Sequence, residues 1–279
     1  MKRILFYLYN NLPKSFQYKL GKIKFLKGLR DFFLKSDGRY KEGTVKVNRT
    51  YQGIDVNFKF CAAIKTAAKA KKTGIETTVL NNSIQLIQKY KQGRTDCTIL
   101  DVGANFGFLS LVWSQTIAKD QGRILAFEPS RHVFKSFSKS IETNRLEDKI
   151  TIINKAVGLE NKPIKLYIDN ATSNINAQNS QQTYETVDMV SLDAYFSKHT
   201  IDTCDLIKID VDGIEYEILK GSQSLINQFR PLCIIETNDD QNIIDFFKNS
   251  DYQIFDMQLQ PLSTNDIPLN IFCVPNELS

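Results

Sequence analysis

From residue 95 onward, short apolar runs rich in β-branched residues alternate with longer amphipathic segments. This alternation predicts a mostly parallel sheet with helices covering both faces. The segments between the runs have the length and spacing of crossover helices. The predicted strands are "CTILDVG" (97–103), "RILAFEP" (123–129), "KITIINKAVG" (149–158), "DLIKIDV" (205–211) and "PLCIIET" (231–237), and the predicted helices span 106–119, 130–144, 215–228 and 240–248.

Two further regions complete this pattern. The runs "IKLYID" and "TVDMVSL" flank the Asn-, Gln- and Ser-rich stretch "NATSNINAQNSQQT", which predicts a strand pair joined by a long polar loop. The last runs, "YQIFDMQ" and "NIFCVP", are predicted to pair antiparallel at the edge of the sheet. Before the sheet, the apolar spacing in "GIETTVLNNSIQLIQKY" (74–90) predicts a helix that covers the ligand crevice.

Charge is concentrated near the N-terminus. Residues 1–49 contain 13 Lys and Arg but three acids, a net charge of +10, and the whole chain carries +5. We therefore predict three parts: a basic, aromatic N-terminal segment (1–49), an accessory or lid region (50–94) and the main domain (95–279). The mixture of aromatic and basic residues suits contact with anionic lipid or a polyanionic glycan, with a solvated docking arm or a nucleic-acid contact as alternatives.

Composition indicates an ordinary globular protein, with 42% hydrophobic and 24% charged residues over 279 positions. The five cysteines are scattered and form no C-x-x-C pair, which favours a reducing cytosol. The apolar stretch near the start, "ILFYLY", is far shorter than the roughly 20 residues of a bilayer span. We expect neither export nor a transmembrane helix.

The turn in "TILDVGANFGF" (98–108) is the first candidate binding element. Gly103 and Gly107 allow a ligand to approach the backbone after the first strand. Asp101 at the end of that strand would repel a pyrophosphate and suits a cation such as an amino-acid ammonium, although it could also be a simple turn residue. Glu128, at the end of the second strand, can accept both hydroxyls of a ribose. An ammonium at one end and a ribose at the other describe S-adenosylmethionine.

The fourth predicted strand carries the candidate catalytic acid. Because the first and fourth strands of such a sheet flank its topological switch point, Asp210 should face Asp101 across the crevice. Methyl transfer requires an aligned nucleophile and a group that takes the hydroxyl proton, which is the role predicted for Asp210. Lys208, inside the same strand, is expected to pair with a nearby acid. His132 and His199 both fall in surface-like segments, so a histidine base is not expected.

The end of the neighbouring strand adds Glu236 and Asn238. Adjacent strands lie about 4.8 Å apart. Asp210 and Glu236 could therefore share a hard cation such as Mg²⁺, with Asp212 or Asn238 as a third oxygen ligand, to orient and acidify a hydroxyl. Without a cation, two neighbouring carboxylates would raise one pKa.

Two acids open the helix that follows Asp210. Acids favour the positive end of a helix dipole, so Glu217 is expected to be structural. Glu215 lies closer to the crevice and is a candidate for contact with the substrate.

Seven sequence blocks occur in order along the chain: "GIE" (74–76), "LDVGANFGFLS" (100–110), "AFEPS" (126–130), "NKAVG" (154–158), "VSLDAYF" (190–196), "DLIKIDVDGIEYEILKG" (205–221) and "IIETN" (234–238). Together they resemble the FkbM-type S-adenosylmethionine-dependent methyltransferases, from about Gly74 to Glu236 with a weaker tail beyond. The resemblance implies a class I methyltransferase fold, a Rossmann-like, doubly wound and mostly parallel seven-stranded sheet with an antiparallel edge, here with a basic N-terminal extension. It also implies O-methylation of a hydroxyl on a sugar or another secondary metabolite. Asp212 departs from the family, which commonly has glutamate there.

Carried over position by position, the resemblance implies a cofactor site. The turn after the first strand would line the methionine end, Glu128 the ribose, and Asn154 with Ala156 the adenine edge, while Pro129 would fix the second turn. Glu76 could reach the amino-acid end of the cofactor, with a helix-capping acid as the alternative. The implied cofactor residues are Glu76, Asp101, Gly103, Ala104, Asn105, Gly107, Glu128, Pro129, Asn154, Ala156 and Val157.

The sequence therefore predicts a cytoplasmic S-adenosylmethionine-dependent O-methyltransferase that acts on a saccharide hydroxyl, such as a surface glycan or glycolipid precursor, or on a related metabolite. Its catalytic residues would be Asp210, Asp212, Glu236 and Lys208. Peripheral contact with the inner membrane face through residues 1–49 is an open option. One alternative is a nucleic-acid methyltransferase that uses the basic arm, although the chain lacks the N/D-P-P-Y/F tetrapeptide often found in enzymes acting on base amino groups. Another is a non-enzymatic membrane- or glycan-binding protein with a retained cofactor pocket.

Overall fold

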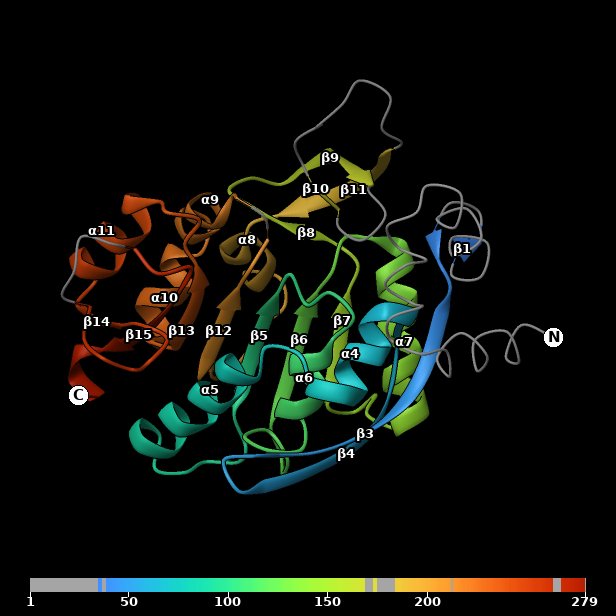
Figure 1. Cartoon of the computed structure of the whole chain (residues 1–279). Helices are drawn as coiled ribbons and strands as arrows, with labels where there is room; N and C mark the ends of the chain where they lie inside the picture. Colours follow the sequence, from blue (N-terminus) through green and yellow to red (C-terminus); the bar gives the residue numbers. More distant parts are fainter. Residues whose placement is uncertain are drawn as a thin grey trace.

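The computed structural model describes residues 35–36, 39–168, 173–174, 184–211, 213–262 and 267–278 (Figure 1). Most of the basic segment, Asp212 and most of the polar loop predicted after "IKLYID" lie outside these ranges.

The central sheet has seven strands in the order β14-β15-β13-β12-β5-β6-β7. The neighbouring strands β7, β6, β5, β12 and β13 pair in parallel. Strand β15 is antiparallel to both of its neighbours, β13 and β14. The predicted seven-stranded sheet with an antiparallel edge is therefore confirmed. The strands are β5 (Thr98–Val102), β6 (Arg123–Phe127), β7 (Ile150–Ile153), β12 (Leu206–Ile209), β13 (Leu232–Glu236), β14 (Tyr252–Phe255) and β15 (Asn270–Pro275).

The strand order reverses beside β5, because β6 and β7 extend the sheet on one side and β12 and β13 on the other. The carboxyl ends of β5 and β12 consequently meet at the switch point where ligands bind in doubly wound sheets. In the register of this pair, Lys208 lies opposite Asp101. Paired residues on neighbouring strands project from the same face of a sheet, so the two side chains are neighbours.

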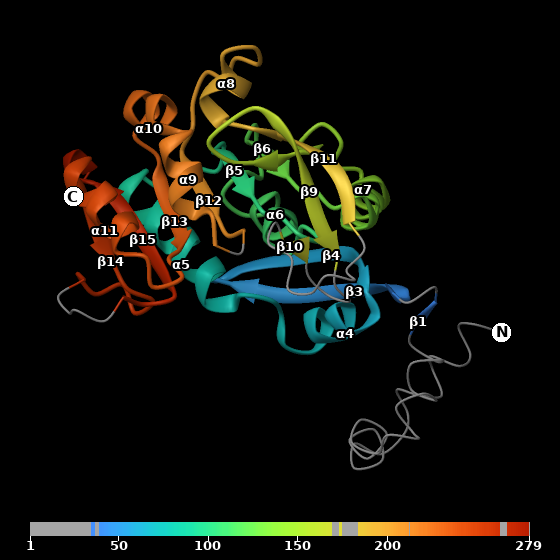
Figure 2. The same ribbon diagram turned by 90° about the horizontal axis from the view of Figure 1, so that it is seen from above.

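Each face of the sheet carries its own apolar core. One core includes residues of α5 (Thr77–Tyr90), α6 (Phe108–Trp113), α7 (Arg131–Asn144), α4 (Ile64–Thr73) and the hairpin of β3 (Glu42–Tyr51) and β4 (Ile54–Ala63). The other includes residues of α8 (Leu192–Phe196), α9 (Glu215–Lys220), α10 (Gln223–Phe229) and α11 (Gln241–Asn249). Seen from above, the hairpin and α4 lie on one side of the sheet, and α8 and α10 lie on the other (Figure 2). No helix within the described ranges combines the length and the apolar character needed to cross a bilayer.

The predicted strand 149–158 is wrong, because it divides between two sheets. After β7 the chain turns at Asn154 and enters β8 (Ala156–Val157). This short strand belongs to a separate four-stranded sheet with the order β10-β9-β11-β8. The Asn154 amide donates to the carbonyls of Glu128 and Pro129, which ties the turn to the end of β6 and separates the two strands. The other members are β9 (Lys162–Ile168), β10 (Ser173–Asn174) and β11 (Tyr184–Val190), and the predicted pairing of β9 with β11 is confirmed.

Two predicted helices are shorter than expected. The segment 106–119 is helical only in α6, because the Ser114 and Thr116 hydroxyls bond to backbone carbonyls one turn earlier and compete with helix continuation. The segment 215–228 divides into α9 and α10. Gly221 lies at the break, where an added Cβ would stand 2.5 Å from the Gly158 carbonyl oxygen, so close packing on the residue that follows β8 determines where the helix ends.

The β3–β4 hairpin was not predicted, and the predicted boundary at residues 49/50 falls inside β3. The rings of Phe58 and Phe60 pack edge-on against Phe108 of α6, at centroid distances of 5.5 and 5.2 Å. The outer edge of β4 is satisfied by side chains: Gln115, Asn144 and Ser140 bond to the backbone of Asn57, Lys59 and Cys61, respectively. Because these side chains occupy the free strand edge, the hairpin is fixed to the main domain rather than exposed to another chain. Two short strands, β1 (Lys35–Ser36) and β2 (Arg39–Tyr40), precede it.

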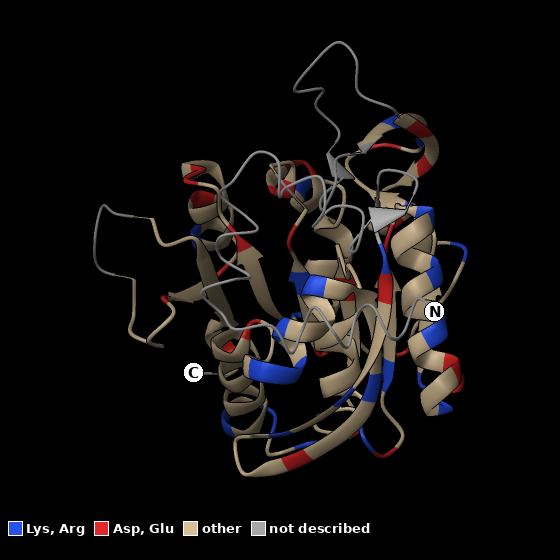
Figure 3. Cartoon of the chain, turned by 45° about the vertical axis from the view of Figure 1, so that its right-hand side comes forward, with Lys and Arg blue, Asp and Glu red and all other residues tan. Residues whose placement is uncertain are grey.

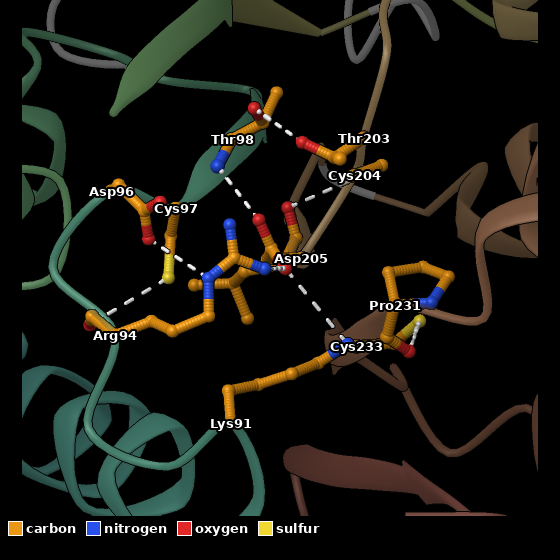
Figure 4. A network of polar contacts seen from close by, with 11 residues as sticks. Lys91, Arg94, Asp96, Cys97, Thr98, Thr203, Cys204, Asp205, Pro231 and Cys233 are labelled. Atoms are coloured by element: carbon orange, nitrogen blue, oxygen red, sulfur yellow. Dashed lines mark hydrogen bonds and ion pairs between the residues drawn. The ribbon is translucent and has the colours of Figure 1, made fainter. Parts of the chain in front are cut away.

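The buried carboxylate of Asp205 anchors the chain between α5 and the sheet (Figure 4). Its oxygens lie 3.0 Å from Arg94 Nη1, 3.9 Å from Lys91 Nζ and 3.0 Å from the backbone nitrogen of Thr98. Asp205 thereby links the start of β12 to the start of β5 and to the end of α5. Loss of Asp205 would remove these contacts together, including the charged acceptor of the Thr98 N–H, although Arg94 would keep its ion pair with Asp96.

We expect Asp205→Ala to lower the free energy of unfolding by roughly 3 kcal/mol, because each hydrogen bond to a charged group contributes roughly 1.5–3 kcal/mol. Asp96→Ala is the matched control, because it removes another carboxylate from Arg94 at the protein surface, where an ion pair contributes about 1 kcal/mol or less. Urea titration of both variants checks the difference. Equal losses for the two variants would show that Asp205 is not the anchor.

Candidate active site

A buried lysine joins the acids of the first and fourth parallel strands. The side chain of Lys208 is 6% exposed, and its Nζ lies 3.7 Å from Asp101 Oδ1 and 3.2 Å from Asp210 Oδ2. It also donates a 3.0 Å hydrogen bond to the carbonyl oxygen of Gly103. One ammonium therefore holds together the two acids that face each other across the switch point.

The charge of Lys208 is stable in this setting. Burial lowers the pKa of Lys208, but the negative charges of Asp210, Asp101 and Glu76 together raise it above its ordinary value. A lysine that remains protonated cannot accept a proton from a substrate. Any catalytic role of Lys208 is therefore electrostatic, through the effect of its positive charge on the acids around it.

Asp101 has one carboxylate oxygen engaged and one without a hydrogen bond. The residue is 1% exposed, and Ser110 Oγ donates to Oδ2 at 2.6 Å. Oδ1 is buried and finds no hydrogen-bond partner among the described residues, because Lys208 at 3.7 Å is too far away. Burial raises the pKa of Asp101, more than Lys208 and Ser110 lower it. Oδ1 is thus an acceptor that lacks a donor. Ser110 was not identified from sequence, although it lies in a matched block.

The backbone N–H groups of the glycine turn are already bonded within the protein. The N–H groups of Gly103 and Ala104 donate to the carbonyl of Phe127, and that of Gly107 donates to the carbonyl of Ala104. The N–H of Asn105 donates to a carboxylate oxygen of Glu128. The N–H of Phe106 donates to the side-chain oxygen of Asn105. A pyrophosphate site requires such N–H groups to point at the ligand. This bonding therefore agrees with the argument against a dinucleotide.

Gly103 is required by close packing. Its φ is +75°, and an added Cβ would stand 1.9 Å from the carbonyl oxygen of Asp210. The turn and the end of β12 therefore touch through their backbones, which brings the first-strand turn directly beside the candidate catalytic acid.

Glu128 and its neighbours form a rigid second turn. The buried carboxylate of Glu128 accepts hydrogen bonds from the backbone nitrogens of Asn105 at 2.9 Å and Ser130 at 2.8 Å. Burial raises the pKa of Glu128 to about 7 despite these bonds. The Asn154 amide donates to the Glu128 and Pro129 carbonyl oxygens at 2.9 and 2.8 Å, so it braces this turn.

The side chains of Ala156 and Val157 lie in apolar cores. Ala156 packs in a small cluster of the second sheet, and Val157 belongs to the core around α8 to α11. The predicted contact of Ala156 and Asn154 with adenine stays a prediction, as does the predicted place of Val157 in the cofactor site.

Asp210 and Glu236 form a carboxylate pair at the ends of β12 and β13. The side chain of Asp210 is 33% exposed, and its negative charge acts on the carboxyl of Glu236. Asn238 Nδ2 lies 3.4 Å from the Glu236 carboxylate. Burial, followed by the negative charge of Asp210, raises the pKa of Glu236 to about 7. Because two neighbouring carboxylates repel each other when both are ionised, the pair holds one proton below this pH.

Glu215 supports the backbone beside this pair. It is buried, and its carboxylate accepts from the backbone nitrogens of Val211 at 3.2 Å and Gly213 at 3.1 Å. Glu215 thus shapes the turn that contains Asp212, which itself lies outside the described residues. Glu217 instead forms an exposed 2.7 Å ion pair with Lys220 one helical turn later.

Glu76 approaches the same centre from the accessory region. It precedes α5 in a left-handed conformation, with φ +47°, and its side chain makes no capping hydrogen bond. Glu76 is exposed, and its charge interacts with those around the switch point: desolvation raises the pKa of its carboxyl, Lys208 lowers it, and Asp210 and Asp101 raise it further. The side chain of Glu76 therefore does not act as a helix cap.

The two histidines have other partners. His132 Nδ1 lies 3.9 Å from Glu42, and His199 stacks on Tyr195 at a centroid distance of 4.4 Å. Within the described ranges, no group of three or more His, Cys, Asp or Glu side chains is arranged to hold a metal ion. The predicted cation site at Asp210, Glu236 and Asn238 thus gains no support, and its other candidate ligand, Asp212, is not described.

Comparison with known proteins identifies the family. The sequence model of the Methyltransferase FkbM domain matches residues 101–254. No curated protein matches the sequence. Similar solved structures include a methyltransferase FkbM from Methylobacillus flagellatus KT, with 18% identity, a TM-score of 0.44, and coverage of 66% of this chain and 49% of that one, so this chain spans about half of its length.

Two other similar structures have a broader overlap. The O-methyltransferase from Bacillus cereus in complex with SAH has 16% identity, a TM-score of 0.45, and coverage of 76% of this chain and 87% of that one. The precorrin-6y C5,15-methyltransferase from Geobacter metallireducens GS-15 has 12% identity, a TM-score of 0.43, and coverage of 77% and 91%.

The FkbM match extends over more than half of the chain and includes both turns of the candidate cofactor site and the Asp210–Glu236 pair. The chain therefore belongs to the FkbM methyltransferase family.

Proposed function

We propose that this protein transfers the methyl group of S-adenosylmethionine to a hydroxyl of a saccharide or a related metabolite, in the cytoplasm. The observation that carries the chemistry is the Asp210–Glu236 pair, in which a carboxyl with a pKa of about 7 stands beside an acid that Lys208 neutralises. A carboxylate of this kind is a better proton acceptor near neutral pH than an ordinary one. The choice of a saccharide is supported by the family resemblance.

The residues around Asp101 suit the amino-acid end of the cofactor. Asp101 Oδ1 is a buried acceptor without a donor, and the charge of Glu76 acts on the same centre. Both would attract the cofactor's ammonium and its positive sulfonium. Gly103 leaves the turn without a side chain where the backbone meets β12. Glu128 accepts one backbone N–H at each oxygen, which leaves one lone pair per oxygen for the two ribose hydroxyls.

When bound, S-adenosylmethionine supplies an electrophilic methyl group on sulfur. The acceptor hydroxyl oxygen forms the new C–O bond as the C–S bond breaks, and the bonding electron pair remains on sulfur. The hydroxyl proton passes to the Asp210–Glu236 pair. Since Lys208 stabilises the charge of Asp210, we assign the proton to Glu236 and the orientation of the hydroxyl to Asp210.

The proposed function is tested by comparing the glycans of cells that make the wild-type protein with those of cells that make Asp210→Ala. We expect one glycan to lose the mass of a methylene group per methylated site in the variant cells, as shown by mass spectrometry. An unchanged glycan profile together with a change in methylated nucleic acid or in another metabolite would contradict a saccharide acceptor.

We expect cofactor affinity to increase with pH through about 7, because only ionised Glu128 can accept both ribose hydroxyls. Below this pH the affinity should fall by up to about tenfold per pH unit. Calorimetric titration with S-adenosylhomocysteine at several pH values measures the effect. In Glu128→Gln the affinity should be low and independent of pH in this range, whereas the exposed control Glu160→Gln should behave as wild type.

We expect Glu236→Gln to reduce kcat by about 100-fold or more, because the amide cannot accept the hydroxyl proton. The wild-type rate should rise as Glu236 loses its proton near pH 7, and this rise should be absent in the variant. Incorporation of labelled methyl groups into a saccharide extract measures both. The neighbouring exposed acid provides the control, Glu217→Gln, which should keep the wild-type profile. An unchanged profile in Glu236→Gln would exclude Glu236 as the proton acceptor.

The cation question has its own test. Because the ammonium of Lys208 already lies 3.2 Å from Asp210, we expect methyl transfer to persist in EDTA within about twofold. Loss of activity in EDTA and its recovery with Mg²⁺ would instead support a cation held by Asp210, Glu236 and Asn238. Labelled methyl transfer with and without added Mg²⁺ separates the two outcomes.

A further inference from the structure

The edge of the central sheet that carries the acids continues past Glu236 onto strand β15. In the register of the parallel strands, Ile209 of β12 lies opposite Ile235 of β13, so the next residues, Asp210 and Glu236, are neighbours. Glu236 in turn lies opposite Asn270, the first residue of β15. One row of residues therefore crosses three strands in the order Asp210, Glu236, Asn270, and Figure 1 shows these strands side by side.

Asn270 projects from the same face of the sheet as the two acids. Opposite residues of paired strands share a face, and successive residues of one strand alternate between faces. The packing agrees, because Phe272, two residues along the strand, belongs to the core on the α5 side of the sheet, as does Ile234 opposite it. The Cβ atoms of directly opposite residues lie about 4.5–5.5 Å apart. The side chain of Asn270 is thus next to that of Glu236.

The position of Asn270 is fixed by hydrogen bonds from the residue that follows Glu236. The buried Thr237 donates its backbone N–H to the Leu269 carbonyl at 2.8 Å and its hydroxyl to the Pro268 carbonyl at 2.7 Å. These bonds hold the chain that enters β15 against the end of β13. A side chain on such a rigid element can hold a substrate group in a defined place.

The side-chain amide of Asn270 is available to a ligand. Among the residues that the structure describes it has no hydrogen-bond partner, and the residue is half-buried, so it keeps contact with solvent. A primary amide has two donor hydrogens and an acceptor oxygen, which suit a hydroxyl group. It also adds no charge beside the acids, which are drawn in red in Figure 3. Asn270 lies beyond residues 101–254, so the family match itself does not include it.

The order of the row determines which side of the acceptor Asn270 can contact. The proposed donor lies over β5, beside Asp101, and the reacting hydroxyl lies at the Asp210–Glu236 pair of the next two strands. Each strand adds about 4.8 Å. Because the acceptor oxygen must face the methyl group of the donor, the rest of the acceptor extends away from β5, over β13 and β15. Asn270 stands on that side.

We propose that Asn270 binds a second hydroxyl of the acceptor, next to the hydroxyl that is methylated, and so selects a saccharide with two neighbouring hydroxyls in a defined arrangement. This inference rests on the proposed function and adds a specificity-determining residue to it. A sugar ring carries hydroxyls on neighbouring carbons, so one ring can contact both side chains. The amide holds the ring while Glu236 receives the proton of the reacting hydroxyl.

The first test measures labelled methyl transfer to a saccharide extract of the source cells by Asn270→Ala. We expect the amount of extract that gives half-maximal labelling to rise about 3- to 10-fold, as for loss of one neutral hydrogen bond, with the affinity for S-adenosylhomocysteine unchanged within about twofold. The matched control is Asn249→Ala, which removes an exposed amide at the end of α11 and should behave as wild type. An unchanged half-maximal amount in Asn270→Ala would overturn the proposal.

The second test uses a readout that loss of a structural contact would not move. The negative charges of Asp210 and Glu215 already act on Glu236. In Asn270→Asp a further carboxylate stands beside Glu236 and raises its pKa, so the rise of the rate with pH should move upward by roughly half a pH unit or more. Asn249→Asp adds the same charge at a distant exposed position and should keep the wild-type profile. A wild-type profile in Asn270→Asp would contradict the placement of Asn270 beside Glu236, and the proposal with it.

These outcomes differ from a failure of the proposed function. Label in a saccharide, with neither Asn270 variant changed, would overturn the role of Asn270 while the proposed function stands. Absence of label from every saccharide fraction, with protein that binds S-adenosylhomocysteine normally, would overturn the saccharide function, and the assignment of Asn270 with it.

Discussion

The candidate site depends on one buried ammonium. Lys208 is surrounded by carboxylates that come from three separate parts of the chain, Asp101 in β5, Asp210 after β12 and Glu76 before α5. Transfer of a single charge from water to the protein interior costs several kcal/mol, and this cost is offset only when opposite charges and hydrogen bonds surround it. The positive charge of Lys208 thus reduces the repulsion between the acids, and the negative charges of the acids keep Lys208 protonated. Because they outnumber it, the centre retains an attraction for a further cation, which is the charge that a sulfonium donor carries.

The backbone around this centre is held in conformations that most residues avoid. Glu76, Asn105 and Asn238 all have positive φ, at +47°, +52° and +47°. Such conformations cost of order 1 kcal/mol or more each and persist where the surroundings hold them. Here the neighbouring contacts do so: the Asn105 nitrogen is bonded to Glu128, and the Gly74 turn before Glu76 is packed on β3. The acids are therefore placed before any ligand arrives, which reduces the reorganisation needed at the moment of reaction.

Most strands of the central sheet could be predicted from the sequence, because short, continuous apolar runs are typical of parallel strands that are buried on both faces. The acids of the switch point followed from topology, since Asp101 and Asp210 end neighbouring strands whatever the loops do. Features that depend on tertiary contacts were missed. The alternating polarity of "GTVKVNRTY" indicates a strand, and the turn at Gln52–Gly53 that follows it indicates a hairpin. The many basic residues of this region drew attention to its charge instead of to this pattern. The break at Gly221 depends on the carbonyl of Gly158, which is distant in sequence, and the role of Glu215 depends on how the turn before it folds back.

The proposed reaction moves a positive charge by a short distance and leaves the total charge of the centre unchanged. The donor's sulfur loses its charge when the methyl group leaves, while the Asp210–Glu236 pair gains the hydroxyl proton. An acidic centre therefore holds one added positive charge both before and after transfer, first on sulfur and then as a proton. Burial and the neighbouring charge of Asp210 favour that proton on Glu236, which lowers the cost of the step. Because the Asp210 side chain is 33% exposed, the proton can return to solvent from the same pair, and the acids are then ionised again for the next donor. A deeper, drier pair would accept the proton more readily but release it more slowly, so partial exposure suits repeated turnover.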